Sequence, residues 1–274
     1  MTASALPSSL VLVGAGKMGG AMLEGWLAVG LDPAGVAVID PKPAPEIESL
    51  CRRRGIRLDP AAEEVRPPEA VVLAIKPQIL DAAAPGIARL VGPGTLLVSI
   101  LAGKTIADLR QRIPGARAVV RAMPNLPASV RRGATGAAAS PETSAAQKAA
   151  AHALLSAVGF VEWLDSEDLI DAVTAVSGSG PAYVFHLVEC IAEAGAAAGL
   201  PPDLSARLAR AMVIGSGELL ARSELSAAQL RQNVTSPGGT TAAALDVLMR
   251  APGLSGLMRE AVAAAKRRAE ELSG

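Results

Sequence analysis

The chain of 274 residues has few aromatic side chains and no excess of either charge. Aromatic residues make up 2% of it, so it lacks the stacked rings with which proteins bind single-stranded nucleic acid. The formal net charge is zero, which does not indicate a nucleic-acid or membrane surface. No uncharged apolar run reaches about 18 residues, and the first residues lack a secretion-signal pattern. We therefore expect a cytoplasmic protein with no nucleic-acid and no membrane partner.

Cysteine and histidine are equally scarce. Cys51 and Cys190 are far apart in the sequence and are expected to be reduced, buried thiols. The two histidines, His152 and His186, lie within helical patterns, and His186 is expected in a core or an interface. No group of residues has metal-ligand spacing, and no G-x-S-x-G motif is present. We expect no bound metal and no serine-hydrolase chemistry.

The chain does contain a glycine loop close to its start. Residues 10–13 predict a buried strand and residues 21–29 a helix, and the loop lies between them. A strand, G-x-G-x-x-G and a helix form the dinucleotide-binding fingerprint, although an ordinary strand–helix turn is the alternative. The first glycine allows the tight turn, the second lets a pyrophosphate approach, and the third lets helix and strand pack closely. The residues assigned to the cofactor here are Gly14, Ala15, Gly16, Lys17, Met18 and Gly19.

Short apolar runs alternate with helical patterns up to about residue 165, which is typical of a mostly parallel α/β sheet. Further strands are expected at 36–39, 56–58, 71–75, 96–100, 118–121, 133–139 and 160–163. The helices between them are expected at 45–54, 78–90, 106–113 and 144–158. Only helices follow, at 169–176, 182–198, 203–220, 226–232, 241–249 and 255–272. The predicted fold is an α/β Rossmann-type domain over residues 1–165 and an all-α dimerisation domain over 166–274.

The helix expected at 182–198 is apolar on most of its circumference. A helix that is apolar all round has to be buried, and one small helical domain could hardly cover it. We therefore expect an intertwined homodimer built on the second domain, with a compact monomeric bundle as the alternative.

Asp40 ends the second expected strand, about 20 residues after the glycine loop, where a dinucleotide-binding fold often has an acidic residue. Its carboxylate can accept hydrogen bonds from the adenosine ribose and would repel a 2′-phosphate, which favours NADH over NADPH. Alternatively, Asp40 only begins a turn with Pro41, and Lys42 could offset the repulsion.

Two more glycine-rich loops precede expected helices. The loop 177–183 (Ser-Gly-Ser-Gly-Pro-Ala-Tyr) either presents backbone to a ligand or forms a corner between helices. The loop 235–241 (Thr-Ser-Pro-Gly-Gly-Thr-Thr) exposes N–H groups at a helix start and carries hydroxyls, which suits a carboxylate. A capped helix start without a ligand is the alternative for the second loop.

Together these features resemble the pyrroline-5-carboxylate reductase family over nearly the whole chain. The motifs that carry the resemblance are the loop 14–19, Ala-Ile-Lys-Pro at 74–77, Arg-Ala-Met-Pro-Asn at 121–125, Asp-Leu-Ile-Asp-Ala-Val at 168–173, the loop 177–183 and residues 236–241. The last two, in this order, are the most specific. The resemblance implies that NADPH or NADH reduces 1-pyrroline-5-carboxylate to L-proline, the last step of proline biosynthesis. It also implies a homodimer, often assembled into a ring of dimers.

The resemblance assigns roles to particular residues of the second domain. The substrate carboxylate would lie against Ser236, Gly238, Gly239 and Thr240. The hydroxyl of Thr241 would lie near the ring nitrogen, which makes Thr241 the catalytic candidate. Glu224 matches a glutamate near the substrate pocket, and a solvated loop carboxylate is the alternative.

On the cofactor side, Lys76 matches a lysine that contacts the ribose and phosphates, with an ordinary surface lysine as the alternative. Asn233 matches an asparagine on the cofactor side of the second loop, and Asn125 and Ser177 are assigned to the cofactor as well. Three positions depart from the family pattern. Asp40 replaces a small hydroxyl residue common in the family, and Leu101 and Leu126 replace smaller or polar residues near the expected nicotinamide region.

Two competing functions stay open at this point. A β-hydroxyacid dehydrogenase has a similar two-domain plan, but it typically carries a catalytic lysine early in the second domain, and residues 165–202 contain none. A nucleotide sensor without turnover is the other alternative, because a fold alone does not fix a function. The carboxylate loop at 236–241 argues against a sensor.

Overall fold

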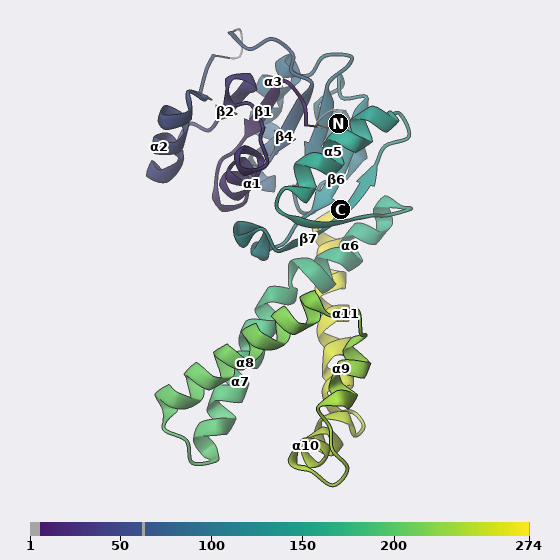
Figure 1. Ribbon diagram of the computed structural model, residues 1–274. Coiled ribbons are helices and arrows are strands. Elements are labelled where there is room, and N and C mark those ends of the chain that lie inside the picture. Colours follow the sequence, from purple (N-terminus) through teal and green to yellow (C-terminus); the bar gives the residue numbers. More distant parts are fainter. Residues whose placement is uncertain (1–5, 62–63, 274) are drawn as a thin grey trace. The chain divides into compact units, whose positions relative to one another are not determined.

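The computed structural model describes residues 6–61 and 64–273, which divide into two compact units (Figure 1). The sheet unit contains the described residues of Met1–Ser179 together with those of Ala265–Gly274. The helical unit is Gly180–Ala264.

One sheet of eight strands forms the centre of the sheet unit in the described part of the chain, in the order β3-β2-β1-β4-β5-β6-β7-β8. The strands are β1 (Leu10–Val13), β2 (Val36–Ile39), β3 (Arg57–Leu58), β4 (Ala70–Leu73), β5 (Leu96–Ser99), β6 (Ala118–Met123), β7 (Gly133–Ala139) and β8 (Gly159–Trp163). Strands β1 to β6 are parallel, β7 is antiparallel to β6, and β8 is parallel to β7. The strand order reverses at β1, which pairs with both β2 and β4. The mostly parallel Rossmann-type sheet is therefore confirmed.

Helices cover both faces of this sheet, which explains why its strands are continuous apolar runs. In β1, Leu10 and Leu12 belong to one core cluster, whereas Val11 and Val13 belong to the other. The first cluster is completed by α1 (Lys17–Ala28), α2 (Pro45–Arg54) and α5 (Ala145–Ser156), and the second by α3 (Leu80–Leu90) and α4 (Ile106–Arg112). Helices α1, α2, α3 and α5 are labelled beside the strands in Figure 1. Because helices cover both faces of the sheet, the ends of its strands are where it can meet a polar ligand.

The helix expected at 106–113 starts where it was predicted, at Ile106 of α4. The Thr105 hydroxyl accepts a hydrogen bond from the Asp108 N–H, and the Asp108 carboxylate accepts one from the Thr105 N–H, so α4 starts with a capping box. The expected helix at 78–90 begins as a 3-10 turn (η3, Pro77–Ile79) before α3. Pro85 lies within α3, which continues through it.

The helix expected at 169–176 consists of three pieces. A 3-10 turn (η5, Glu167–Leu169) leads into α6 (Ile170–Val173), and a π-helical turn (η6, Thr174–Gly178) follows. The Ser179 N–H donates to the carbonyl of Thr174 at 2.8 Å, which accommodates one extra residue in the turn. After β8 the described residues contain no further strand, as predicted.

The expected boundary at residue 165 directly follows β8, but the sheet unit extends further. It also includes η5, α6, η6 and the last turns of α11 (Gly253–Ser273). Polar contacts join these segments to the sheet and to one another. Arg121 of β6 pairs with Glu167 and Asp171, and the Ser273 hydroxyl donates to Asp171.

The helical unit consists of α7 (Gly180–Ala197), α8 (Pro202–Arg222), α9 (Ala227–Asn233), α10 (Thr240–Met249) and the first part of α11. Helices α7 and α8 form an antiparallel pair that approaches closely at Gly195. A Cβ at Gly195 would lie 2.2 Å from the hydroxyl oxygen of Ser205, which donates to the carbonyl of Ala192 at 2.7 Å. A methyl at this position would displace the Ser205 hydroxyl from its hydrogen bond.

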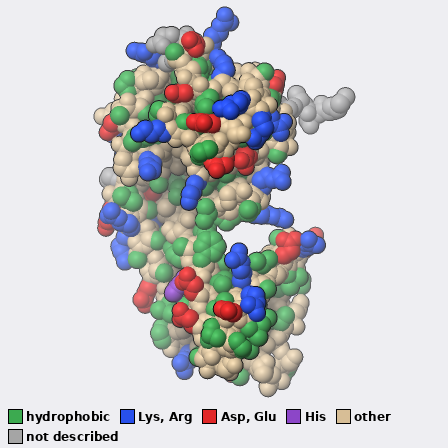
Figure 2. All heavy atoms as spheres, turned by 90° about the vertical axis from the view of Figure 1, so that its left-hand side faces the viewer, with side chains coloured by type: hydrophobic (Ala, Val, Ile, Leu, Met, Phe, Trp, Pro, Cys, Tyr) green, Lys and Arg blue, Asp and Glu red, His purple; other side chains and the backbone are tan. Residues whose placement is uncertain are grey.

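Large apolar side chains of the helical unit stay exposed in the single chain, as Figure 2 shows. No residue of the fully described α7 is buried, and Phe185, Met212 and Leu257 are 54%, 47% and 64% exposed. Exposed apolar surface of this extent marks an interaction site. The finding agrees with the expectation that a second chain covers α7.

The cysteines differ from the prediction in one respect. Cys51 is buried as expected, and burial raises the pKa of its thiol. Cys190 is exposed in the single chain, so its predicted burial is wrong at this level. It lies on α7, which has no buried residue in the single chain. The His186 side chain is exposed too, with its Nδ1 atom 3.0 Å from a carboxylate oxygen of Glu189, so His186 is not a core residue of the single chain.

Across the described residues, no helix has the length and apolar character needed to span a membrane.

Candidate functional site

The first glycine loop connects β1 to α1 at the edge of the sheet. Gly14 has a φ of +90°, and its N–H donates to the carbonyl of Ile39 at 2.9 Å. A Cβ at Gly14 would lie 2.8 Å from the carbonyl oxygen of Ala74, just after β4. The loop therefore turns in the narrow space where β1, β2 and β4 end, and this turn requires glycine.

The other two glycines of the fingerprint have different surroundings. A Cβ at Gly19 would lie 2.1 Å from the carbonyl oxygen of Gly14, so α1 packs directly on its own loop. A Cβ at Gly16 would meet no described atom within 4 Å, so the space in front of the helix start is open. Gly16 is the N-cap of α1, and no side chain of the described residues caps the helix. The free N–H groups and positive dipole end of α1 thus face open space, which fits a pyrophosphate.

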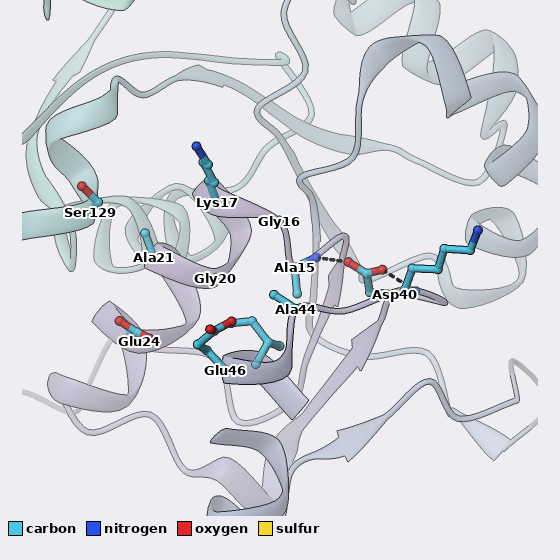
Figure 3. Close-up of a pocket in the computed structure, with 12 residues that line it drawn as sticks. Ala15, Gly16, Lys17, Gly20, Ala21, Glu24, Asp40, Ala44, Glu46 and Ser129 are labelled. Atoms are coloured by element: carbon cyan, nitrogen blue, oxygen red, sulfur yellow. Dashed lines mark hydrogen bonds between the residues drawn. The ribbon is translucent and has the colours of Figure 1, made fainter. Parts of the chain in front are cut away.

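A cavity of about 490 Å³ lies beside this helix start (Figure 3). One wall comes from α1, another from α2 and the end of β2, and a serine of η4 (Leu126–Val130) completes it. The lining residues are Ala15, Gly16, Lys17, Gly20, Ala21, Glu24, Asp40, Lys42, Ala44, Glu46, Ile47 and Ser129. Sequence reasoning assigned four of these to the cofactor site: Ala15, Gly16 and Lys17 of the glycine loop, and Asp40. Glu24 could have been found, because it shares a face of α1 with Lys17 and Gly20, whereas nothing in the sequence indicates Ser129.

Asp40 binds the glycine loop directly. One carboxylate oxygen accepts a hydrogen bond from the Ala15 N–H at 2.8 Å, and the other accepts one from the Lys42 N–H at 2.9 Å (Figure 3). The hydrogen bond from Lys42 forms the turn that was considered as the alternative role of Asp40. The hydrogen bond from Ala15 is a contact that sequence reasoning missed. Because Asp40 also lines the cavity, a ligand bound there would lie beside its carboxylate.

Lys76 and Met18, two further cofactor candidates of the sheet unit, lie apart from each other. Lys76 is exposed at the start of η3. Met18 lines a second cavity of about 340 Å³ together with Lys17, Ala21, Leu126 and Ser129, so the two cavities share three residues.

Asn125 and Ser177 are brought together although 52 residues separate them. The Asn125 side-chain amide donates to the Ser177 hydroxyl at 3.1 Å and to the Ser177 carbonyl at 3.2 Å. The side-chain oxygen Oδ1 of Asn125 accepts a hydrogen bond from the Ala134 N–H at 2.9 Å, and the Ser177 hydroxyl donates to the backbone carbonyl of Ala134 at 3.0 Å. This network fixes the π-helical turn η6 to β7.

In the helical unit, five predicted substrate residues share the loop that leads into α10. The Gly239 N–H donates to the Ser236 carbonyl at 3.0 Å, and Gly238 has a φ of +70°. Gly239 is the N-cap of α10, and here too no described side chain caps the helix. Thr240 and Thr241 form its first turn. The capped start considered as an alternative is therefore wrong, and the free N–H groups suit a small carboxylate.

Glu224 and Asn233 lie outside this loop. Glu224 is exposed in the connection between α8 and α9, and Asn233 is the exposed last residue of α9.

Comparisons with known proteins cover both units. Residues 167–272 match the family model described as pyrroline-5-carboxylate reductase dimerisation, and residues 9–103 match the model described as NADP oxidoreductase coenzyme F420-dependent. A pyrroline-5-carboxylate reductase of Pseudomonas aeruginosa is 40% identical over 96% of each chain. One of Synechocystis is 40% identical over 96% of this chain and 97% of the relative.

Solved structures give the same result. A pyrroline-5-carboxylate reductase of Coxiella burnetii superimposes with a TM-score of 0.91 at 34% identity, over 98% of this chain and 99% of the other. The Plasmodium falciparum pyrroline carboxylate reductase, solved with NADP bound, has a TM-score of 0.80 at 26% identity, over 97% and 98% of the two chains.

Proposed function

The chain belongs to the pyrroline-5-carboxylate reductase family, and from this premise we propose that it reduces 1-pyrroline-5-carboxylate to L-proline with NADH or NADPH. This reaction is the last step of proline biosynthesis. The observation that carries the proposal is the 40% identity to a reductase over 96% of both chains. The two family models include both glycine loops, one at residues 9–103 and the other at 167–272.

The sheet unit would hold the cofactor, which supplies the hydride when bound. The open start of α1, with Gly14 to Gly19, would bind the pyrophosphate through its N–H groups. Asp40 would accept a hydrogen bond from the adenosine ribose, since each carboxylate oxygen keeps a lone pair beyond its backbone contact. From the family resemblance, Lys76, Asn125, Ser177 and Asn233 would complete this side of the site.

The loop into α10 would hold the substrate. Ser236, Gly238, Gly239 and Thr240 would bind its carboxylate, because the uncapped helix start offers N–H donors to an anion. Thr241 would steady the ring nitrogen as its positive charge disappears. From the family resemblance, Glu224 would lie near the same pocket.

These residues would act through position rather than through strong acid or base chemistry. Holding the imine carbon in place contributes up to about 7–11 kcal/mol in favourable systems. A threonine hydroxyl is a poor proton donor near neutral pH, so Thr241 is assigned no role as general acid. The proton comes from water or from an imine that is already protonated.

The helical domain would form a homodimer, and the dimers would form a larger ring in the cytoplasm. The exposed apolar side chains of α7, α8 and α11 support the dimer. The dimerisation family model starts at residue 167, which supports a functional boundary between residues 1–165 and 166–274.

Steady-state reduction of 1-pyrroline-5-carboxylate with NADH and NADPH in parallel tests the proposal. We expect saturable turnover that yields L-proline, with a higher kcat/KM for NADH. Preference for NADPH would mean that Lys42 and Lys17 outweigh Asp40. A preparation that binds a dinucleotide but turns over with neither cofactor would contradict the assignment and favour the dehydrogenase or sensor alternative.

A further inference from the structure

The last turn of α11 packs against the loop that follows β5 within the sheet unit. A Cβ at Gly103 would lie 2.6 Å from the carbonyl oxygen of Leu272, so the two backbones are in direct contact. Gly103 also has a φ of +68°. Both the backbone conformation and the close approach therefore require glycine at this position.

The next residue of α11 is tied to the same unit by a hydrogen bond. The Ser273 hydroxyl donates to a carboxylate oxygen of Asp171 in α6 at 3.1 Å. The same oxygen lies 3.5 Å from a guanidinium nitrogen of Arg121, which is on β6 and only 3% exposed. The end of the chain is thus attached to a buried cation of the sheet.

Arg121 also fixes the far end of the loop after β5. Its second terminal nitrogen lies 3.0 Å from a carboxylate oxygen of Glu167. This oxygen accepts a hydrogen bond from the N–H of Ile106, the first residue of α4, at 2.8 Å. The loop between β5 and α4 is therefore held in its middle by Leu272 and at its end by Glu167.

The position of this loop in the sheet suggests what it contacts. Dinucleotides bind across the strand ends where the strand order reverses, and here that point is β1. The cavity at Asp40 lies on the β1–β2 side, which is the adenosine half of such a site. The other half of the dinucleotide would then extend over the ends of β4, β5 and β6, where the loop of Leu101 to Gly103 begins.

We propose that the last turn of α11 positions the nicotinamide half of the cofactor by holding the loop of Leu101 to Gly103. Ser273, Asp171 and Arg121 are positioning residues, because they act through this loop. The inference rests on the proposed function only in that the chain binds NAD(P)H, and it is independent of the substrate.

A chain that ends at Glu271 tests the inference through binding alone. Its affinity for NADH should fall about five- to tenfold, as expected for the loss of one or two contacts. Its affinity for ADP-ribose, which lacks the nicotinamide, should stay within about twofold of the parent. NADH fluorescence and calorimetry with ADP-ribose measure the two affinities on the same preparation.

Two single substitutions sharpen the test. Ser273→Ala should weaken NADH binding about two- to threefold and leave ADP-ribose binding unchanged, because it removes one hydrogen bond. Glu271→Ala is the matched control: its side chain pairs with Arg268 on the exposed surface, and both affinities should stay as in the parent.

The inference is overturned if the shortened chain binds NADH as the parent does, or if NADH and ADP-ribose weaken together. A parent chain that binds NADH without reducing 1-pyrroline-5-carboxylate would overturn the proposed function and leave this inference standing.

Discussion

The loop of Gly14 to Gly19 in the sheet unit and the loop of Thr235 to Thr241 in the helical unit both lead into a helix, and the surroundings of their glycines differ. In the loop of the sheet unit, an added methyl at Gly14 or Gly19 would strike the chain's own backbone, at 2.8 and 2.1 Å. In the loop of the helical unit, a Cβ at Gly238 would meet no described atom within 4 Å, and one at Gly239 would be 3.2 Å from the Ser236 carbonyl oxygen. Two glycines of the first loop are therefore required by packing and only Gly16 faces open space, whereas packing requires neither glycine of the second loop.

The two helix starts are nevertheless alike, and they differ from their neighbours. Helices α4, α5 and α9 begin with capping boxes at Thr105, Ser144 and Ser226. Helices α2 and α8 have a proline in the first two positions, which removes a free donor. Helices α1 and α10 begin at a glycine, with no cap from the described side chains. Both of these glycine starts therefore offer free N–H groups to an anion.

Gly19→Ala should break the first loop and have the largest effect. The new methyl would meet the backbone oxygen of Gly14, which no rotamer change can relieve, so we expect a destabilisation of at least about 1–3 kcal/mol and loss of NADH binding. Thermal unfolding and NADH titration measure both effects. Gly16→Ala is the control, because its methyl enters open space: the protein should unfold at the parent temperature. An unchanged unfolding temperature in Gly19→Ala would contradict the packing argument.

Thr241→Ala tests the second loop, where we expect an effect on turnover rather than on folding. Loss of one hydrogen bond to the ring nitrogen should lower kcat about tenfold, with little change in cofactor affinity. Thr241→Ser should restore most of the rate, because it keeps the hydroxyl. Steady-state kinetics with both substrates provide the measurement. Equal losses in kcat and cofactor affinity would point to a folding role for the start of α10.

Asp40→Ser should shift the balance between the cofactors. Removing one negative charge from the adenosine side of the site should raise the NADPH-to-NADH ratio of kcat/KM about tenfold, since such a charge contributes about 1–3 kcal/mol. Asp40→Asn removes the negative charge but keeps an oxygen that can accept the hydrogen bond from the Ala15 N–H, so it separates the effect of the charge from that of the hydrogen bond. An unchanged ratio in both variants would mean that Asp40 serves only to hold the loop.

The smallest effect is expected at a capped helix. The pKa of Asp108 is subject to an upward shift from burial, but the hydrogen bonds of Thr105 and the charges of Lys104 and Arg112 lower it overall. A lowered folded-state pKa stabilises the protein above the unfolded-state pKa, and this contribution is lost as the pH falls through the folded-state value. Asp108→Asn should therefore cost about 1 kcal/mol near neutral pH and progressively less in acid. Unfolding in urea at several pH values measures this, and a constant difference would contradict it.

The sequence allowed the elements and both loops to be predicted because their signals are local. The strands are continuous apolar runs because their side chains are buried alternately on the two faces of the sheet. At the start of α4, the capping residues Thr105 and Asp108 are only three positions apart. The family resemblance assigned both Asn125 and Ser177 to the cofactor, and the structure brings the two side chains into contact.

The remaining features depend on contacts between distant segments, which no local pattern contains. The extra residue of η6, the place of Ser129 in the cavity wall and the bond from Ala15 to Asp40 are of this kind. The exposure of Cys190 is another case, because burial of α7 depends on surface outside the single chain.

The most direct test of separate cofactor and substrate loops is to measure KM for NADH and for 1-pyrroline-5-carboxylate in the Gly16→Ala and Gly239→Ala variants. A methyl at either helix start should exclude only the anion bound there. We expect Gly16→Ala to raise the KM for NADH alone and Gly239→Ala to raise the KM for 1-pyrroline-5-carboxylate alone. If each variant raised both values, or neither, the assignment of cofactor and substrate to separate helix starts would be wrong.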